Sequence, residues 1–102
     1  MYKLTVTAPA ERDLDEILGY IAAALGNPQA AVALAEDISK CYDDLSDMPF
    51  MYEECRDPRL KTLGYRRVVI GHYVMVYRVD ETCHTVYILR FFYGPSDYEK
   101  MI

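Results

Sequence analysis

The sequence predicts a small α+β domain: an N-terminal strand, an antiparallel hairpin of two helices, then a three-stranded antiparallel meander, with the helices packed on one face of the sheet. Two patterns support this order. Apolar residues recur at the helical period of about 3.6 residues between residues 8 and 48, and β-branched and aromatic residues form three runs between residues 64 and 95. A chain of 102 residues can bury one hydrophobic core, so we expect a single domain over residues 1–102.

The first strand and the helical hairpin are predicted from the residues that begin and end them. Residues 2–7 alternate apolar and polar side chains, which is typical of a short strand at a sheet edge. Thr7 is suited to cap the first helix, and Gly26 is suited to end it. Asn27–Pro28 is a second helix start, and Pro49 ends that helix. Because the connection is so short, the two helices must lie antiparallel.

Each predicted helix carries one apolar stripe that we expect to face the sheet, ending at Leu25 in the first helix and at Met48 in the second. Residues 49–63 contain two prolines and no periodic pattern, so an irregular loop is expected there. After Gly94–Pro95 the tail is expected to form at most one helical turn, with Tyr98 folding back toward the sheet. The stripe residues are Ala10, Leu14, Ile17, Leu18, Ile21 and Leu25, then Ala31, Leu34, Ala35, Ile38, Cys41, Leu45 and Met48.

The first turn of the meander fixes its register. Gly71–His72 is a two-residue hairpin turn with glycine first, as a type II′ turn requires, so Ile70 pairs with Tyr73. The face toward the helices then carries Arg66, Val68, Ile70, Tyr73, Met75, Tyr77 and Val79. The outer face carries Tyr65, Arg67, Val69, Val74, Val76 and Arg78, and we expect Ile88, Arg90 and Phe92 of the third strand to join it.

The charges are segregated along the chain, within a net charge of −5. Residues 11–57 hold twelve acidic residues against three basic ones, whereas residues 59–79 hold five basic residues and no acidic one. A basic strip attracts anions locally, but the overall negative field opposes long-range attraction of nucleic acid. The expected partner of the strip is therefore an acidic peptide.

Cysteine, histidine and hydropathy patterns exclude several classes of protein. Cys41, Cys55 and Cys83 are widely spaced and form no CxxC motif, and His72 and His84 have no partner at metal-ligand spacing. We therefore expect no disulfide framework, no metal site and no cofactor. No apolar run approaches the roughly 20 residues that span a bilayer, and the N-terminus lacks a signal peptide, so a cytoplasmic protein without membrane contact is expected.

Three segments, in this order, resemble the RelE/ParE superfamily, the toxins of type II toxin–antitoxin modules. They are LTVTAPAERDLDEILGYI, RLKTLGYRRVVIGHYVMVYRVDE and VYILRFFYGPSDYEKMI, which together cover nearly the whole chain. The resemblance implies a plasmid-stabilisation or addiction toxin that arrests growth when it is free of its cognate antitoxin. It also implies that an extended segment of this antitoxin wraps the helices and the sheet.

The resemblance leaves two branches open. RelE-like members cut mRNA on the ribosome, which requires cations at the phosphate and an acid/base pair, and Arg67, Arg78 and Tyr98 are the catalytic candidates in that case. Two arginines usual in those nucleases are replaced here by Val74 and by Pro95–Ser96. ParE-like members block DNA gyrase without a nuclease site, and the last strand, the long hairpin and the acidic balance favour this branch.

The outer sheet face is the expected contact surface for the target or the antitoxin. Arginines there would form charge-assisted pairs, and apolar side chains would supply buried area. A degenerate toxin that only binds antitoxin remains an alternative, and so does a sheet face whose arginines are merely solvated. The predicted contact residues are Arg66, Arg67, Val74, Val76, Arg78, Arg90, Phe92 and Tyr93.

Overall fold

Four strands form one sheet in the order β1-β4-β3-β2, in a computed structural model that describes residues 1–102. β1 lies parallel to β4, and the other neighbours are antiparallel. The predicted fold class is confirmed. The elements are β1 (Lys3–Val6), α1 (Ala8–Gly19), the π-helical turn η1 (Tyr20–Ala24), α2 (Pro28–Asp47), α3 (Pro58–Thr62), β2 (Tyr65–Ile70), β3 (Tyr73–Asp80), β4 (Thr85–Tyr93) and the 3₁₀ turn η2 (Tyr98–Lys100).

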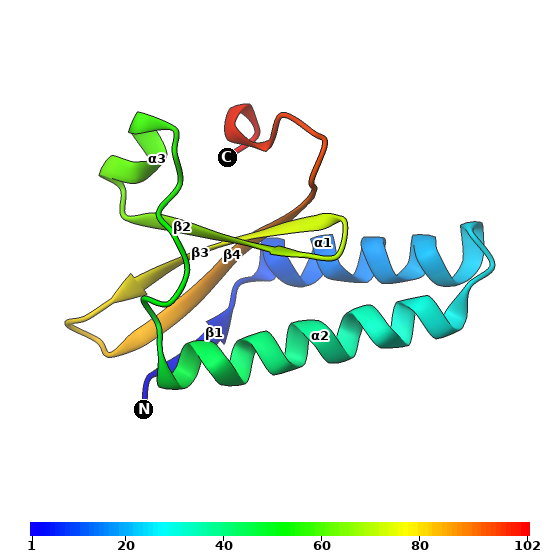
Figure 1. Cartoon of the computed structure of the whole chain (residues 1–102), viewed down its shortest axis with the longest axis horizontal. Coiled ribbons are helices and arrows are strands. Elements are labelled where there is room, and N and C mark those ends of the chain that lie inside the picture. Colours follow the sequence, from blue (N-terminus) through cyan, green and yellow to red (C-terminus); the bar gives the residue numbers. More distant parts are fainter.

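The sheet lies between two layers of unequal size. Figure 1 shows α1 and α2 side by side on one face, and α3 with the C-terminal turn on the other. The main core fills the space between the helical hairpin and the sheet, where Leu45, Met75 and Tyr77 are fully buried. No helix is both long and apolar enough to span a bilayer.

The ends of the helical hairpin follow the predicted signals. The Thr7 hydroxyl accepts a hydrogen bond from the Ala10 N–H at 3.4 Å, and the Asn27 side chain accepts one from the Ala30 N–H at 3.1 Å. Gly26 has the left-handed φ of 61° that glycine adopts without strain. The caps therefore act as expected for both helices.

The last turn of the first helical segment differs from the prediction. In η1 the Leu25 N–H bonds to the Tyr20 carbonyl at 3.0 Å, five residues back, so this turn contains one residue more than an α-helical turn. The extra residue moves Leu25 off the apolar stripe, and its side chain is exposed rather than buried. The stripe prediction was wrong for Leu25 because it assumed an unbroken α-helix. It was also wrong for Met48, which lies just after the end of α2 and is exposed.

The β2–β3 turn has the predicted register. Ile70 pairs with Tyr73, and Gly71 has a φ of 60° whereas His72 does not lie in the positive region, as a type II′ turn requires. Val68 and Met75 accordingly point into the main core, as expected from the alternation along each strand.

A β-bulge in β4 changes which of its residues face outward. Val76 pairs with Arg90 but the next residue, Tyr77, pairs with Ile88, so Leu89 is an extra residue in β4. Ile88 is fully buried in the main core, and its predicted position on the outer face was wrong. Ile88 and Arg90 would point to the same face in a regular strand, but the extra residue between them places them on opposite faces. Arg90 therefore shares the outer face with Val76, as predicted.

The outer face is covered by two segments of the chain itself. A short helix, α3, lies within the stretch expected to be irregular, and the Asp57 side chain caps it by accepting from the Arg59 and Leu60 N–H groups. Together with the tail, α3 closes a second, smaller core that contains Cys55, Leu60, Val74, Val76, Phe92 and Tyr98. The expectation that Val74, Val76 and Phe92 form an accessible face was therefore wrong.

Candidate functional site

Arg67 lies in β2 beside the segment that leads to α3. Its guanidinium forms an ion pair with Glu53 at 3.0 Å, and its backbone N–H also bonds to the Glu53 carbonyl at 3.1 Å. The side chain is only 20% exposed, and its Nε is buried without a hydrogen-bond partner. Arg67 is thus paired within its own chain, and its buried Nε has no hydrogen-bond acceptor.

Tyr98 folds back onto the outer face, as predicted. Its ring stacks on Phe92 with centroids 5.8 Å apart, and two donors of Arg59 hold the tail, one bonding to the Glu99 carbonyl at 2.8 Å and the other to the Ile102 carbonyl at 3.2 Å. Burial raises the pKa of the Tyr98 hydroxyl, and the positive charge of Arg67 partly opposes the rise. The structure therefore brings Arg67 and Tyr98 into one neighbourhood, with the phenol neutral at pH 7.

Arg78 and Arg66 point to other places. The Arg78 guanidinium lies 4.5 Å from the centre of the Tyr87 ring and 4.0 Å from Asp80. Arg66 is on the helical side of the sheet, where it donates to the Tyr52 carbonyl at 2.7 Å. Neither guanidinium joins Arg67 and Tyr98 in a common cluster.

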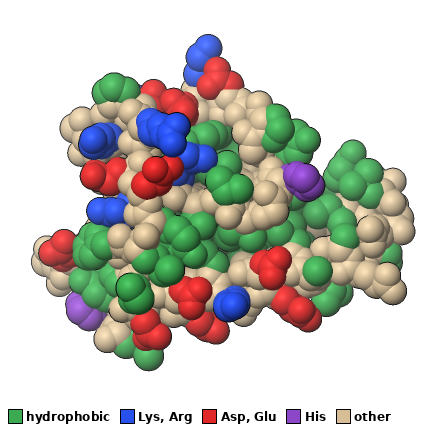
Figure 2. Space-filling model, viewed as in Figure 1, with side chains coloured by type: hydrophobic (Ala, Val, Ile, Leu, Met, Phe, Trp, Pro, Cys, Tyr) green, Lys and Arg blue, Asp and Glu red, His purple; other side chains and the backbone are tan.

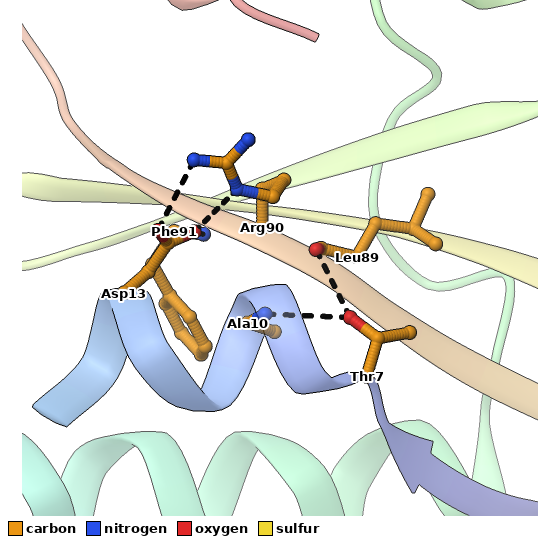
Figure 3. A network of polar contacts seen from close by, with 6 residues as sticks. All are labelled: Thr7, Ala10, Asp13, Leu89, Arg90 and Phe91. Atoms are coloured by element: carbon orange, nitrogen blue, oxygen red, sulfur yellow. Dashed lines mark hydrogen bonds and ion pairs between the residues drawn. The ribbon is translucent and has the colours of Figure 1, made fainter.

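Arg90 is bound to α1 (Figure 3). Asp13 accepts hydrogen bonds from Arg90 Nε at 2.6 Å, from Arg90 Nη2 at 3.1 Å and from the Phe91 N–H at 3.0 Å. At the N-cap of α1, the Thr7 hydroxyl donates to the Leu89 carbonyl at 3.1 Å. The bond to Asp13 raises the pKa of Arg90. Arg90 thus fastens the bulge of β4 to the first helix.

The buried thiols are not activated nucleophiles. Burial raises the pKa of Cys41 and of Cys55, so both remain protonated at neutral pH. No group of three or more histidine, cysteine or acidic side chains is placed to hold a metal ion.

Two cavities lie away from Arg67 and Tyr98, between the helical hairpin and the tip of the β2–β3 turn. The larger one, of about 750 Å³, is lined by Glu16, Ile17, Tyr20, Leu25, Tyr73 and Tyr93. A smaller one, of about 250 Å³, is lined by Ile21, Ala30, Ala33, Leu34, Asp37 and Gly71, and His72 and Tyr73 border both. We call the two cavities together the hairpin groove. Figure 2 shows a band of hydrophobic side chains between the helical layer and the sheet, bordered by acidic side chains.

Of the predicted contact residues, only Tyr93 lines the hairpin groove. The groove was missed because its walls come from five elements, α1, η1, α2, β3 and β4, together with the β2–β3 turn, and because η1 was not foreseen. One signal was present in the sequence: Tyr20 is an aromatic residue outside the apolar stripe of its helix, and such a side chain needs a partner or remains exposed.

A family model described as the ParE toxin of type II toxin–antitoxin systems, parDE, matches residues 4–98. The chain belongs to this family. The toxin–antitoxin complex RelBE2 from Mycobacterium tuberculosis is a similar solved structure, with 27% sequence identity, coverage of 90% of this chain and 90% of that chain, and a TM-score of 0.62. The chromosomal ParDE system from P. aeruginosa has the same fold, with 23% identity, coverage of 91% and 96%, and a TM-score of 0.70. No curated protein matches the chain.

This ParE-family chain therefore has two distinct surface features. On the outer face, Arg67 and Tyr98 are neighbours, but Glu53 neutralises the first and packing on Phe92 covers the second. Beside the helical hairpin, an apolar groove is open to solvent. Arg67 and Tyr98 could do acid/base chemistry only after rearrangement, whereas the hairpin groove can accept apolar groups as it stands.

Proposed function

We propose that this ParE-family toxin arrests growth by binding and blocking DNA gyrase when it is free of its antitoxin. The observation that supports this branch is that the three candidate catalytic residues of a nuclease already contact other groups of their own chain. RNA cleavage needs free cations at the phosphate and a proton donor and acceptor within hydrogen-bond reach of the reacting atoms. Here Arg67 is paired with Glu53, Arg78 lies on Tyr87, and Tyr98 is 8% exposed.

The proposal includes a cognate antitoxin as the partner that neutralises the toxin in the cytoplasm. The two similar solved structures are both toxin–antitoxin systems, and one of them is described as a complex. The family model is itself that of the toxin of a two-component system. A free toxin of this kind would need continuous neutralisation, which a protein partner supplies by mass action.

The second candidate function is ribosome-dependent mRNA cleavage. It is favoured by the proximity of Arg67 to Tyr98, since a guanidinium and a phenol are groups that can stabilise a phosphate and transfer a proton. This function requires the C-terminal tail to move so that the phenol reaches its substrate.

The two functions are separated by expressing the toxin from an inducible promoter in a bacterial host without antitoxin. We expect growth arrest with blocked gyrase supercoiling and intact messages. Tyr98→Phe is the discriminating variant, because it keeps the packing on Phe92 and removes only the hydroxyl. It should remain fully toxic if the target is gyrase.

Cut messages in the wild type, together with loss of cleavage in Tyr98→Phe, would establish the endonuclease in place of the gyrase poison. Arrest with neither cut messages nor blocked supercoiling would refute both mechanisms. Normal growth with folded protein in the cells would mean that the chain only binds its antitoxin, and the proposed function would then be wrong.

A further inference from the structure

Three large apolar side chains are exposed on the loop that follows α2. Met48, Phe50 and Met51 are 61%, 45% and 43% exposed. None of them belongs to either core or lines either cavity of the hairpin groove. Single exposed apolar residues are common on proteins, but three of them within one short loop form a patch of the kind found at interaction sites. We call Met48, Phe50 and Met51 together the apolar knob.

The loop that carries the knob is held in place from inside the main core. The buried Tyr77 hydroxyl donates to the Pro49 carbonyl at 3.0 Å, and Pro49 is itself buried. The Met51 N–H bonds to the Met48 carbonyl at 3.2 Å, which closes a turn around Pro49 and brings the two methionines together. The knob is therefore exposed in one fixed arrangement, and little ordering is needed before a partner binds.

Arg66 of β2 positions the aromatic member of the knob. Its guanidinium donates to the Tyr52 carbonyl at 2.7 Å and lies 5.0 Å from the centre of the Phe50 ring. A cation held over one face of an aromatic ring attracts the ring and fixes its orientation. The other side of the Phe50 ring remains open to solvent, so the chain holds an apolar ring at its surface instead of burying it.

The knob is bordered by acidic residues on both sides along the chain. Residues 43–54 hold five acidic residues and no basic one. Asp47 directly precedes the knob and Glu54 follows it closely. Both are exposed, and neither forms an ion pair within the chain. The field around the knob therefore attracts cationic groups.

The acidic residues before the knob lie where they lower the stability of α2. The carboxyl end of a helix carries a partial negative charge, so an acidic side chain in its last turns is unfavourable. Nevertheless Asp43, Asp44 and Asp47 end α2, and its last turn has no basic residue. Folding does not account for these charges, whereas attraction of a basic surface does.

The knob and the hairpin groove lie at opposite ends of α2. The groove is bordered by the first half of α2, at Ala30–Asp37, whereas the knob begins directly after the last residue of the helix. Figure 1 shows α2 running from the turn after α1 to the side of the molecule where the chain begins. The Tyr2 N–H accordingly bonds to the Ser46 carbonyl at 2.8 Å. A partner can therefore contact the knob without entering the groove.

We propose that the apolar knob inserts into an apolar pocket on the cellular target of the toxin, and that lysine and arginine residues around this pocket pair with Asp47 and Glu54. The proposal deepens the proposed function and rests on it, in that it takes gyrase as the target. An enzyme that acts on DNA presents basic surface to the phosphates. Such a target carries the positive charge that the acidic border of the knob complements.

Inhibition of purified gyrase by the purified full chain tests the knob. Met48→Gln with Met51→Gln keeps the length of both side chains and replaces their thioethers with amides. We expect half-inhibition of supercoiling to need about tenfold more of this variant than of the wild type. The matched control is Val32→Gln with Leu63→Gln, which changes two apolar residues that are 58% and 54% exposed outside the knob. The control should inhibit as the wild type does, and circular dichroism should show both variants folded.

Charge variants test the acidic border. Asp47→Asn with Glu54→Gln should raise the concentration needed for half-inhibition by about threefold, and added salt should narrow this difference. The matched control is Asp15→Asn with Glu36→Gln, which removes the same charge from exposed positions away from the knob and should change nothing.

Three results would overturn the proposal: inhibition by the methionine variant at the wild-type concentration, equal weakening by the two double charge variants, or self-association of the chain through the knob. The first of these would leave the gyrase function intact.

Growth arrest by the same variants separates the knob from the choice of target. If the wild type arrests growth without inhibiting gyrase, the proposed function is wrong. Relief of that arrest by the methionine variant alone would then keep the knob as the contact with another target, whereas unchanged arrest would refute the knob as well. A wild type that neither inhibits gyrase nor arrests growth would refute both.

Discussion

At the scale of single residues, Asp13 joins two distant parts of the chain. β1 pairs with β4 only as far as Ile88, so the edge of β4 beyond that point is free to receive the first turns of α1. The Asp13 carboxylate then accepts the Phe91 N–H, which would otherwise lack a strand partner, and neutralises Arg90. One acidic side chain thus replaces a β-ladder bond and an external counter-ion.

Replacing Asp13 by alanine should lower the free energy of unfolding by about 2–3 kcal/mol, because the substitution leaves a half-buried guanidinium and a backbone donor without an acceptor. Asp15→Ala is the matched control, since Asp15 is exposed and its side chain makes no hydrogen bond or ion pair, and it should change stability by less than about 0.5 kcal/mol. Urea unfolding followed by circular dichroism measures both. Equal losses would show that Asp13 contributes through helix charge alone.

Tyr77 gives the chain a sensitivity to alkaline pH. Its hydroxyl donates to the Pro49 carbonyl at 3.0 Å inside the main core, and burial raises the pKa of Tyr77 to about 12. The unfolded phenol ionises near its ordinary pKa of about 10, so the unfolded state releases protons first and stability falls as pH rises between these two values.

We expect the wild type to lose about 1 kcal/mol of stability from this residue between about pH 8 and about pH 11, and Tyr77→Phe to lack that part of the loss. At the lower pH the variant should be less stable by about 1 kcal/mol because its hydrogen bond is gone. Urea unfolding at the two pH values provides the measurement. A variant with the same pH dependence as the wild type would contradict the assignment.

At the scale of elements, turns and caps could be predicted because their signals are local. Thr7, Asn27 and Gly71 each act through bonds or dihedral angles within a few residues, and the structure has all three in the expected roles. The bulge at Leu89 could not be predicted in this way. It depends on α1 occupying the edge of β4, a contact between residues nearly the whole chain apart.

The closure of the outer face was predictable in principle from β3. Its sequence, YVMVYRVD, is apolar at successive positions rather than at alternate ones, and a strand with two apolar faces needs cover on both. What the sequence leaves open is which segment supplies the cover. α3 has five residues and one fully buried side chain, Leu60, so its helical pattern is too short to recognise.

Two glycines at the helical hairpin should respond in opposite ways to alanine. Gly19 has an ordinary helical φ of −63° and free space around it, so Gly19→Ala should stabilise the chain by about 0.5–1 kcal/mol. Gly26 has equal space but a φ of 61°, so Gly26→Ala should destabilise it by about 1 kcal/mol. Thermal unfolding of the pair checks this. A loss at both sites would mean that η1 itself requires Gly19.

At the scale of the whole molecule, the two layers differ in how firmly they are held. The helical layer contributes two helices of several turns, whereas the outer layer consists of α3, η2 and the loops around them. Arg59 joins the two parts of the outer layer through its bonds to the tail carbonyls. The outer layer is therefore expected to open locally before the sheet unfolds.

Arg59→Ala should release the tail without unfolding the sheet. The N–H groups of Lys100 and Met101, which bond within the last turn, should exchange with solvent about tenfold faster or more, while those of β3 keep their protection. Lys61→Ala, on the same short helix and without any side-chain bond, is the control and should change neither. Hydrogen exchange measured by NMR distinguishes the cases. Faster exchange in β3 as well would contradict a separately opening layer.

The strand order also determines when during its synthesis this chain can fold. β4 lies between β1 and β3, and its residues Thr85–Tyr93 are synthesised after those of the other three strands. Until they emerge, β1 has no strand partner and Asp13 has no bulge to bind. The main core then lacks Val86, Ile88 and Phe91, and the second core lacks Phe92. Pairings of such long sequence separation form late. The nascent toxin therefore has only the β2–β3 part of its sheet, and no complete surface, until β4 has been synthesised.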